Sequence, residues 1–353
     1  MRNHVVWPAI VRTLAVVAAL AGVATTAAAA DAVEDFYKGK QIRLIVGSTP
    51  GGIFDNLGRL MARHMGKFIP GHPAIVVENL PGASSLTAAN YVVNSAPRDG
   101  TVIASVLSSA PLAETMGKEG VRFKANELSW IGSISRETFI AYVYKTSKIQ
   151  TLENTLTTET VFGGQAPGAA SIDIAVIAKK LFGLKLKIVG GYPGGSETKL
   201  ALEKGEIDGI FANGWSDLKA KQNDWVRDRT VRIIAQHGLT RHAELPEVPL
   251  LLDWAKASED RRFLEFVLGR NEFAKPYFAA PGVPADRMEA LRRAFDRTMT
   301  DKDFLAEAVK ANVEPDGPMT GQAVAAAIAK MSETPKSMID RMNAIFDEFG
   351  KGL

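Results

Sequence analysis

A buried strand, a glycine-rich loop and the start of a helix follow one another in Ile42-Arg43-Leu44-Ile45-Val46-Gly47-Ser48-Thr49-Pro50-Gly51-Gly52-Ile53-Phe54-Asp55. The first five residues are apolar except for one arginine, which favours a buried strand. Glycines and a proline then break the strand. Beyond the loop, apolar residues return at spacings of three, four or seven and predict a helix with one buried face: Leu57, Leu60, Met61, Met65 and Phe68.

The same alternation continues along the chain. A second strand (74–78), a helix (85–95) and a third strand (101–106) predict a parallel sheet with helices on both faces. A second series has strands at 139–145, 160–162, 185–189, 207–212 and 231–235, and helices at 170–182, 196–204 and 216–225. Beyond 277–279 we expect helices to the end. The pattern therefore predicts an α/β protein with two lobes and a helical tail.

The first thirty residues read as a secretory signal peptide. Arg2 and Arg12 precede an apolar stretch from Leu14 to Val23, and small residues end at Ala28-Ala29-Ala30. The alternative is an uncleaved membrane anchor, but the uncharged run is short for a bilayer span. We expect cleavage after Ala30 and a periplasmic protein, and the leader has no cysteine to carry a lipid anchor.

Composition narrows the function classes. The 353 residues include 42 Lys and Arg against 39 Asp and Glu, and no cysteine, so neither a disulfide framework nor a strong charge imbalance exists. The sequence has no basic stripe with interleaved aromatic residues of the kind that nucleic-acid binding needs. Length suggests about two domains. We place a first lobe at 31–133 plus 246–353 and a second at 134–245, with a hinge and a ligand cleft between them.

Two glycine-containing loops of the first lobe are candidate anion sites. Loops that leave the carboxyl end of a strand and enter a helix present free backbone N–H groups and the helix dipole. The first loop contributes Ser48, Thr49, Gly52 and Asp55, and the second contributes Ala83, Ser84 and Ser85. The alternative is structural, with Asp55 and one of the two serines acting as helix caps. Because Asp55 would repel an anion, we expect it to act in selectivity or capping.

The second lobe repeats this arrangement. Residues 162–169 contribute Gln165, Ala166 and Gly168, and residues 191–196 contribute Tyr192. Asn213 and Trp215 follow a later strand and offer a polar contact and an aromatic wall, although a tryptophan is more often part of the core. Amide-rich loops from both lobes therefore predict an anion site between them.

Several of these motifs are similar to a known family. The run from Ile42 to Asp55 resembles the first strand and ligand loop of the tripartite tricarboxylate transporter receptors, also called Bug-type receptors. Further matches, in order along the mature chain, are Val77-Glu78-Asn79 with Pro81-Gly82-Ala83, Asp99-Gly100-Thr101, Gly191-Tyr192-Pro193-Gly194, Gly205 to Gly209 and Ala280 to Pro284. One departure is Ser84-Ser85, where the family usually has glycines.

The resemblance implies a type II periplasmic binding-protein fold, with the ligand between two lobes and its carboxylate held by backbone amides and ordered waters. It implies a two-component integral membrane permease as the partner, a small organic carboxylate as the ligand, no cofactor and no catalysis. We expect a monomer. Tyr192 and Trp215 hint at an aromatic or extended ligand. A receptor for a periplasmic sensing pathway is an alternative, and a secreted hydrolase or lyase on a similar scaffold is the competing class.

Short enzyme motifs in the sequence give little support to a secreted hydrolase or lyase. Ser196-Glu197-Thr198-Lys199 matches the S-x-x-K pattern, but the companion S-D-N and K-T-G elements are missing. The close histidine pair, His237 and His242, has no further ligands that the sequence identifies, which argues against a metal site.

Overall fold

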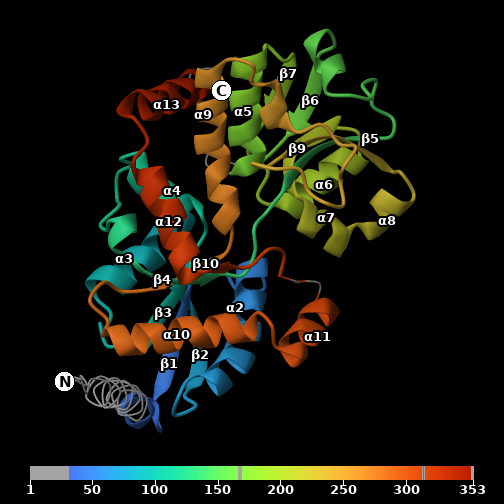
Figure 1. The fold of residues 1–353 in the computed structure, drawn as a ribbon. Helices are drawn as coiled ribbons and strands as arrows, with labels where there is room; N and C mark the ends of the chain where they lie inside the picture. The colour runs from blue at the N-terminus through green and yellow to red at the C-terminus, as the bar shows by residue number, and fades with distance from the viewer. Residues whose placement is uncertain (1–31, 166–168, 312, 314, 351–353) are drawn as a thin grey trace, which may run out of the picture.

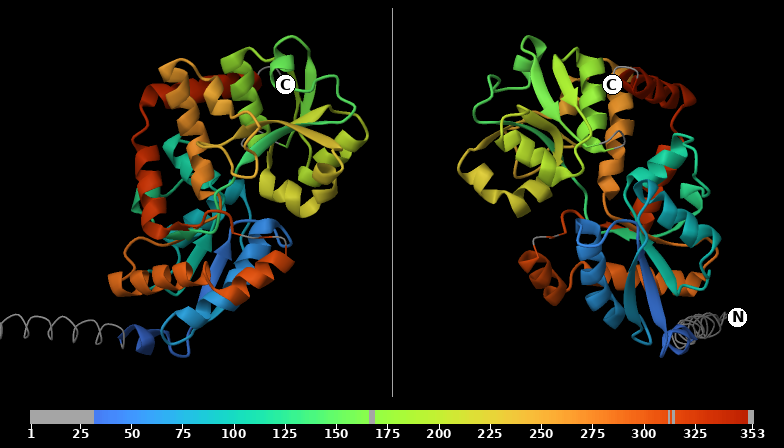
Figure 2. Two further views of the ribbon diagram at one scale, coloured as in Figure 1. Left: turned by 45° about the vertical axis from the view of Figure 1, so that its right-hand side comes forward. Right: turned by 180° about the vertical axis from the view of Figure 1, so that it is seen from behind.

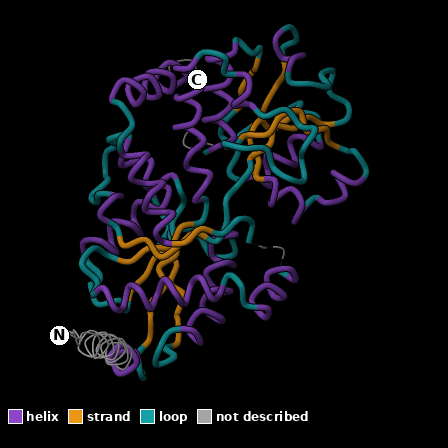
Figure 3. The backbone as a smooth tube through the Cα atoms, in the orientation of Figure 1, coloured by secondary structure: helices purple, strands orange, loops and turns teal. Residues whose placement is uncertain are grey.

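The computed structural model describes residues 32–165, 169–311, 313 and 315–350. Residues 1–30, for which we predict a signal peptide, and the candidate residues Ala166 and Gly168 lie outside this part. The described chain forms two lobes, each with a sheet at its centre and helices around it (Figures 1 and 3). Within the described residues, no helix is both long and apolar enough to cross a membrane.

The first lobe is built on a six-stranded sheet with the order β11-β4-β10-β3-β1-β2. β1 runs parallel to β2 and β3, as the strand and helix alternation predicts, whereas β10 is antiparallel to β3 and β4. The strands are β1 (Gln41–Val46), β2 (Ala74–Asn79), β3 (Val102–Ser105), β4 (Ser129–Ser133), β10 (Pro276–Ala279) and β11 (Met319–Thr320).

Alternating side chains of this sheet enter two cores. Leu44 and Val46 pack with α2, α10 and α11 on one face, whereas Ile45 packs with α3, α4 and α12 on the other. The helices are α2 (Ile53–Met65), α3 (Leu86–Asn94), α4 (Ser109–Thr115), α10 (Ala285–Thr298), α11 (Lys302–Lys310) and α12 (Gly321–Ser332).

The second lobe has a five-stranded sheet with the order β7-β6-β8-β5-β9. β6 is parallel to β7 and β8, and β5 is antiparallel to both β8 and β9. The strands are β5 (Phe139–Tyr144), β6 (Thr160–Gly163), β7 (Leu186–Val189), β8 (Gly209–Gly214) and β9 (Val231–His237). The helices are α5 (Ala170–Phe182), α6 (Gly195–Glu203), α7 (Trp215–Lys221) and α8 (Asn223–Arg227).

Two chain segments cross from one lobe to the other and run side by side; they are called the crossing segments below. One leads from β4 to β5, and the other follows α9 (Ser258–Gly269) into β10. Their backbones are hydrogen-bonded, from Glu137 N to Asn271 O at 2.9 Å and from Ala274 N to Ser135 O at 3.1 Å. A further link is α13 (Lys336–Gly350), which packs against α5 of the second lobe (Figure 2). The exact lobe boundaries stay a prediction.

Most predicted elements are confirmed within one or two residues, two predictions are wrong, and β4, α4 and α9 were not predicted. Hydrophobic periodicity did not indicate β4, because Ser129-Trp130-Ile131-Gly132-Ser133 is short and contains a glycine. The helical tail is interrupted by β11, a two-residue strand paired with Ser133 and Gly132. The predicted helix 216–225 is divided in two at Gln222, which has a non-helical φ of −133°.

Candidate functional site

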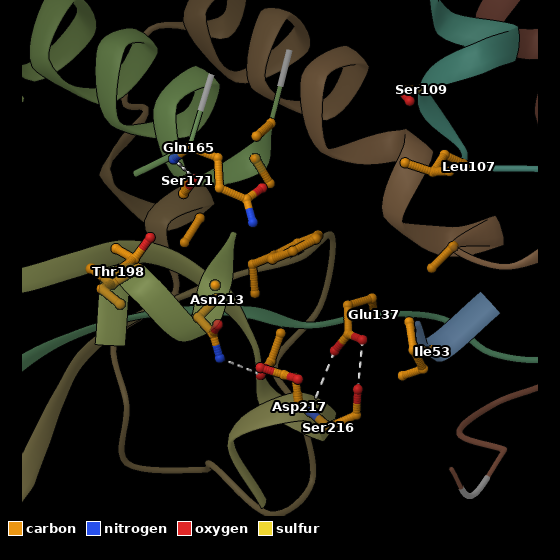
Figure 4. A pocket seen from close by; sticks show the side chains of 18 of the residues that line it. Ile53, Leu107, Ser109, Glu137, Gln165, Ser171, Thr198, Asn213, Ser216 and Asp217 are labelled. Carbon is orange, nitrogen blue, oxygen red and sulfur yellow. Dashed lines mark hydrogen bonds between the residues drawn. The ribbon is translucent and has the colours of Figure 1, made fainter. Parts of the chain in front are cut away.

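A cavity of about 780 Å³ lies between the two lobes. The first lobe contributes Ile53, Phe54, Ser84, Leu107, Ser108 and Ser109, and the crossing segments contribute Glu137, Arg270, Ala274 and Lys275. Figure 4 shows Ile53, Leu107 and Ser109 on one side, with Gln165, Ser171, Thr198 and Asn213 of the second lobe facing them. The cavity therefore has walls from both sheets and from the segments that connect them.

Five helices begin at this cavity. Each of them follows a strand in the chain, because β1, β3, β6, β7 and β8 have their carboxyl ends toward the space between the lobes. The lining residues at the starts of α2, α4, α5, α6 and α7 are, respectively, Ile53, Ser109, Ala170, Gly195 and Ser216. Unpaired N–H groups at helix starts carry partial positive charge, so this arrangement favours an anion.

The first candidate loop lies beside the cavity rather than in its wall. Ser48, Thr49, Gly52 and Asp55 are not among the lining residues, and Ile53 and Phe54 occupy that position. The Asp55 carboxylate accepts from Gly51 N at 2.9 Å and pairs with Arg59 at 3.0 Å. Burial raises the pKa of Asp55, but the hydrogen bonds from Arg59 and Gly51 outweigh it and hold the pKa below its ordinary value. Asp55 is thus committed to its own helix start.

The second candidate loop has an unusual backbone. Ala83, Ser84 and Ser85 have φ values of 45°, 52° and 75°, a region that glycine adopts more readily. Ser84 is exposed and lines the cavity, whereas Ser85 is buried. The Ser85 hydroxyl donates to Gly47 O at 2.8 Å and accepts from Leu107 N at 3.1 Å. This serine therefore ties together the loops that follow β1, β2 and β3.

The candidates of the second lobe fall into two groups. Gln165, Tyr192 and Asn213 line the cavity, and the Gln165 side chain extends into it (Figure 4). Trp215 is buried in a core cluster of the second lobe, and its indole N–H donates to Glu244 at 2.6 Å. It lines a separate cavity of about 440 Å³ instead. Its position agrees with the structural alternative, in which Trp215 belongs to the core.

Charged residues of the crossing segments are an element of the site that the sequence did not reveal. Glu137, Arg270 and Lys275 are all at the cavity wall. Lys275 Nζ lies 3.5 Å from Glu137 Oε2, which also accepts from the Ser216 hydroxyl at 2.6 Å. The one available signal was the presence of two cations, Arg270 and Lys275, in the short segment directly before a buried strand.

Lys199 and His237, which belong to the enzyme-like sequence patterns, are held in structural contacts. Lys199 of the S-x-x-K pattern donates to Asp217 at 2.7 Å and to Gln222 at 2.5 Å, so its ammonium group joins α6 to α7. His237 is fully buried and hydrogen-bonded to Phe211 O at 2.7 Å. In the part of the chain that the structure describes, no cluster of three or more His, Cys, Asp or Glu could hold a metal ion.

Comparison with known proteins agrees with this geometry. Residues 58–344 match the family model described as "Tripartite tricarboxylate transporter family receptor". A UPF0065 protein in the gbd 5′ region of Cupriavidus necator is 24% identical over 339 residues, which cover 93% of this chain and 95% of that protein.

Solved structures show the same fold. A TctC solute binding protein from Polaromonas is 19% identical, with a TM-score of 0.66 over 86% of this chain and 99% of that one. An R. palustris protein solved with adipate is 18% identical, with a TM-score of 0.61 over 88% and 98%. The expected type II periplasmic binding-protein fold is thereby confirmed.

Proposed function

The chain belongs to the tripartite tricarboxylate transporter receptors, and from that premise we propose that it captures a small organic carboxylate between its lobes and delivers it to a two-component membrane permease. This family consists of periplasmic solute-binding receptors and not of enzymes. We further propose that residues 1–30 direct export and are then removed.

The observation that carries the proposal is the convergence of five helix starts on one inter-lobe cavity. An anion there would accept hydrogen bonds from the backbone of both lobes at once. A ligand that contacts both lobes binds the closed form more tightly than the open form, and this difference in affinity shifts the population toward closure. The closed form is then the state that the permease recognises.

Different candidate residues serve different purposes in this proposal. Ser84, Gln165, Tyr192 and Asn213 line the cavity and would contact the ligand directly. The remaining described candidates, Ser48, Thr49, Gly52, Asp55, Ala83 and Ser85, would hold the strand ends behind the wall. Trp215 would contribute through the core rather than through the ligand.

A thermal-shift screen of the mature protein against mono-, di- and tricarboxylates tests the proposal. We expect at least one acid to raise the melting temperature, to be recovered unchanged, and to make the protein more compact in solution scattering. Gln165→Ala should weaken binding of that acid about fivefold to tenfold, since one hydrogen bond of about 1 kcal/mol or slightly more is lost. Gln322→Ala, on the exposed face of α12, is the matched control and should bind normally.

Two outcomes would refute the proposal. A complete absence of stabilisation by any acid would exclude a carboxylate receptor. Chemical conversion of a bound acid would favour the competing class, a secreted hydrolase or lyase.

A further inference from the structure

One buried cation in the ligand cavity is poorly matched by the protein. Arg270 begins the 3₁₀ turn Arg270–Phe273, is 5% exposed, and lines the cavity. Its contact with Asp173 Oδ2 spans 3.5 Å. Among the described residues this is the guanidinium group's one hydrogen bond, although the group carries five N–H donors. Its remaining N–H donors are not among the described buried polar atoms without a partner, so they are open to the cavity and available to an acceptor on the ligand.

A second unmatched polar group lies at the same place. The Ser109 hydroxyl, at the start of α4, is buried and has no hydrogen-bond partner within the described part of the chain. Arg270, Ser84 and Ser109 are the three residues that line both the ligand cavity and a neighbouring cavity of about 310 Å³. They therefore lie where the two cavities adjoin, and Figure 4 shows Ser109 on the same side of the ligand cavity as Leu107 and Ile53.

Each lysine of the cavity has either a shorter contact than Arg270 or a second protein partner. Lys199 and Lys221 share Asp217 at 2.7 and 2.9 Å, and Lys275 lies beside both Glu137 and the Ser135 hydroxyl. Arg270 differs because most N–H donors of its guanidinium group have no protein acceptor among the described residues. The planar arrangement of these donors suits an acceptor with two oxygens, such as a carboxylate. An oxyanion placed here would satisfy Arg270 and Ser109 together.

We infer that Arg270, assisted by Ser109, binds a second anionic group of the ligand and makes this receptor select dianions over monoanions. The inference rests on the proposed function, in which the helix starts hold the first carboxylate. Arg270 is then the residue that determines specificity, and it acts from the segment that connects the lobes. A second carboxylate is the chemistry that fits this planar donor group best.

The test compares each dicarboxylate, from succinate to adipate, with the monoamide of the same acid, which has the same length and one charge fewer. Calorimetric titration of the mature protein should show that the preferred diacid binds at least about tenfold more tightly than its monoamide. Equal affinities for the two would overturn the inference while leaving the carboxylate receptor intact. If no acid or monoamide binds, the proposed function itself fails and the inference fails with it.

Variants then assign the preference to Arg270. Arg270→Gln combined with Asp173→Asn removes the cation together with the carboxylate that it contacts, and the diacid and its monoamide should then bind about equally. Arg227→Gln is the matched control, because Arg227 is 69% exposed at its side chain, is paired with Asp228 and is not among the residues that line the cavity. It should keep the preference.

Ser109→Ala tests the same subsite if the double variant does not fold. It should reduce the preference for the diacid severalfold, since one hydrogen bond is lost. An undiminished preference in a folded double variant, or in Ser109→Ala, would refute the role assigned to this subsite.

Discussion

The hydroxyl of Ser85 is predicted to hold the cavity wall together, and Ser85→Ala removes it. The substitution deletes the bond to Gly47 O and leaves the Leu107 N–H without its acceptor. Alanine keeps the same backbone position at φ 75°, so the perturbation is confined to the hydroxyl. The matched control is Ser84→Ala, at the neighbouring exposed residue, which has a similar φ of 52°.

The expected loss follows from two hydrogen bonds. Each bond contributes about 1 kcal/mol net, and a donor left buried without an acceptor adds to the cost, so Ser85→Ala should lower the free energy of unfolding by about 2 to 3 kcal/mol. In a chain of this size we expect a fall in melting temperature of about 5 °C. Ser84→Ala should change stability by less than about 0.5 kcal/mol.

Thermal unfolding followed by circular dichroism measures the difference, and calorimetric titration with the acid found in the screen measures its consequence for binding. Because Ser85 connects strand ends that carry lining residues, ligand affinity should fall together with stability. If Ser85→Ala and Ser84→Ala melt at the same temperature, the bridge does not support the wall and this reasoning is wrong.

Three further perturbations have defined outcomes. Asp316→Asn removes the 3.1 Å contact with His242 that joins the lobes, and should weaken ligand binding about twofold to threefold in calorimetry, since such half-exposed pairs are weak. Burial lowers the pKa of His237 to about 4 despite its hydrogen bond to the backbone, so between pH 6.5 and 4 the unfolded chain gains a proton that the folded chain does not. The free energy of unfolding should therefore fall by about 3 kcal/mol as pH drops through that window, and His237→Gln should flatten the slope of urea-unfolding stability against pH. Gly132→Ala should cost about 1 to 3 kcal/mol in thermal unfolding, because the added methyl group meets the Phe295 ring, whereas Gly269→Ala, with open space around it, should not destabilise.

The fold was largely predictable because hydrophobic periodicity is a local signal. The strand at β1 and the helix α2 follow from residues within one stretch of 27, and the parallel order follows from their alternation. What periodicity did not predict is where the chain inserts antiparallel strands. β10 enters between β3 and β4 after more than a hundred intervening residues, and no local pattern records that pairing.

The residues that follow strands in the site could be predicted from the sequence, but its charged residues on the crossing segments could not. Gln165 and Asn213 follow predicted strands, and the topology brings both to the cavity. Arg270 and Lys275 reach the same cavity from a connecting segment whose course depends on the whole fold. Their burial is likewise a tertiary property, since sequence alone predicts exposed side chains for arginine and lysine.

The two antiparallel strands have a mechanical consequence. β5 and β10 continue directly from the crossing segments and lie inside their sheets, each with a hydrogen-bonded neighbour on both sides. We expect any rotation of one lobe against the other to be confined to a few residues around Ser135 and Ala274, because both anchored strands are paired on each side. Glu137, Arg270 and Lys275 belong to those same segments. A ligand that touches them would then lie next to the expected hinge, and we expect its charge to influence the angle between the lobes.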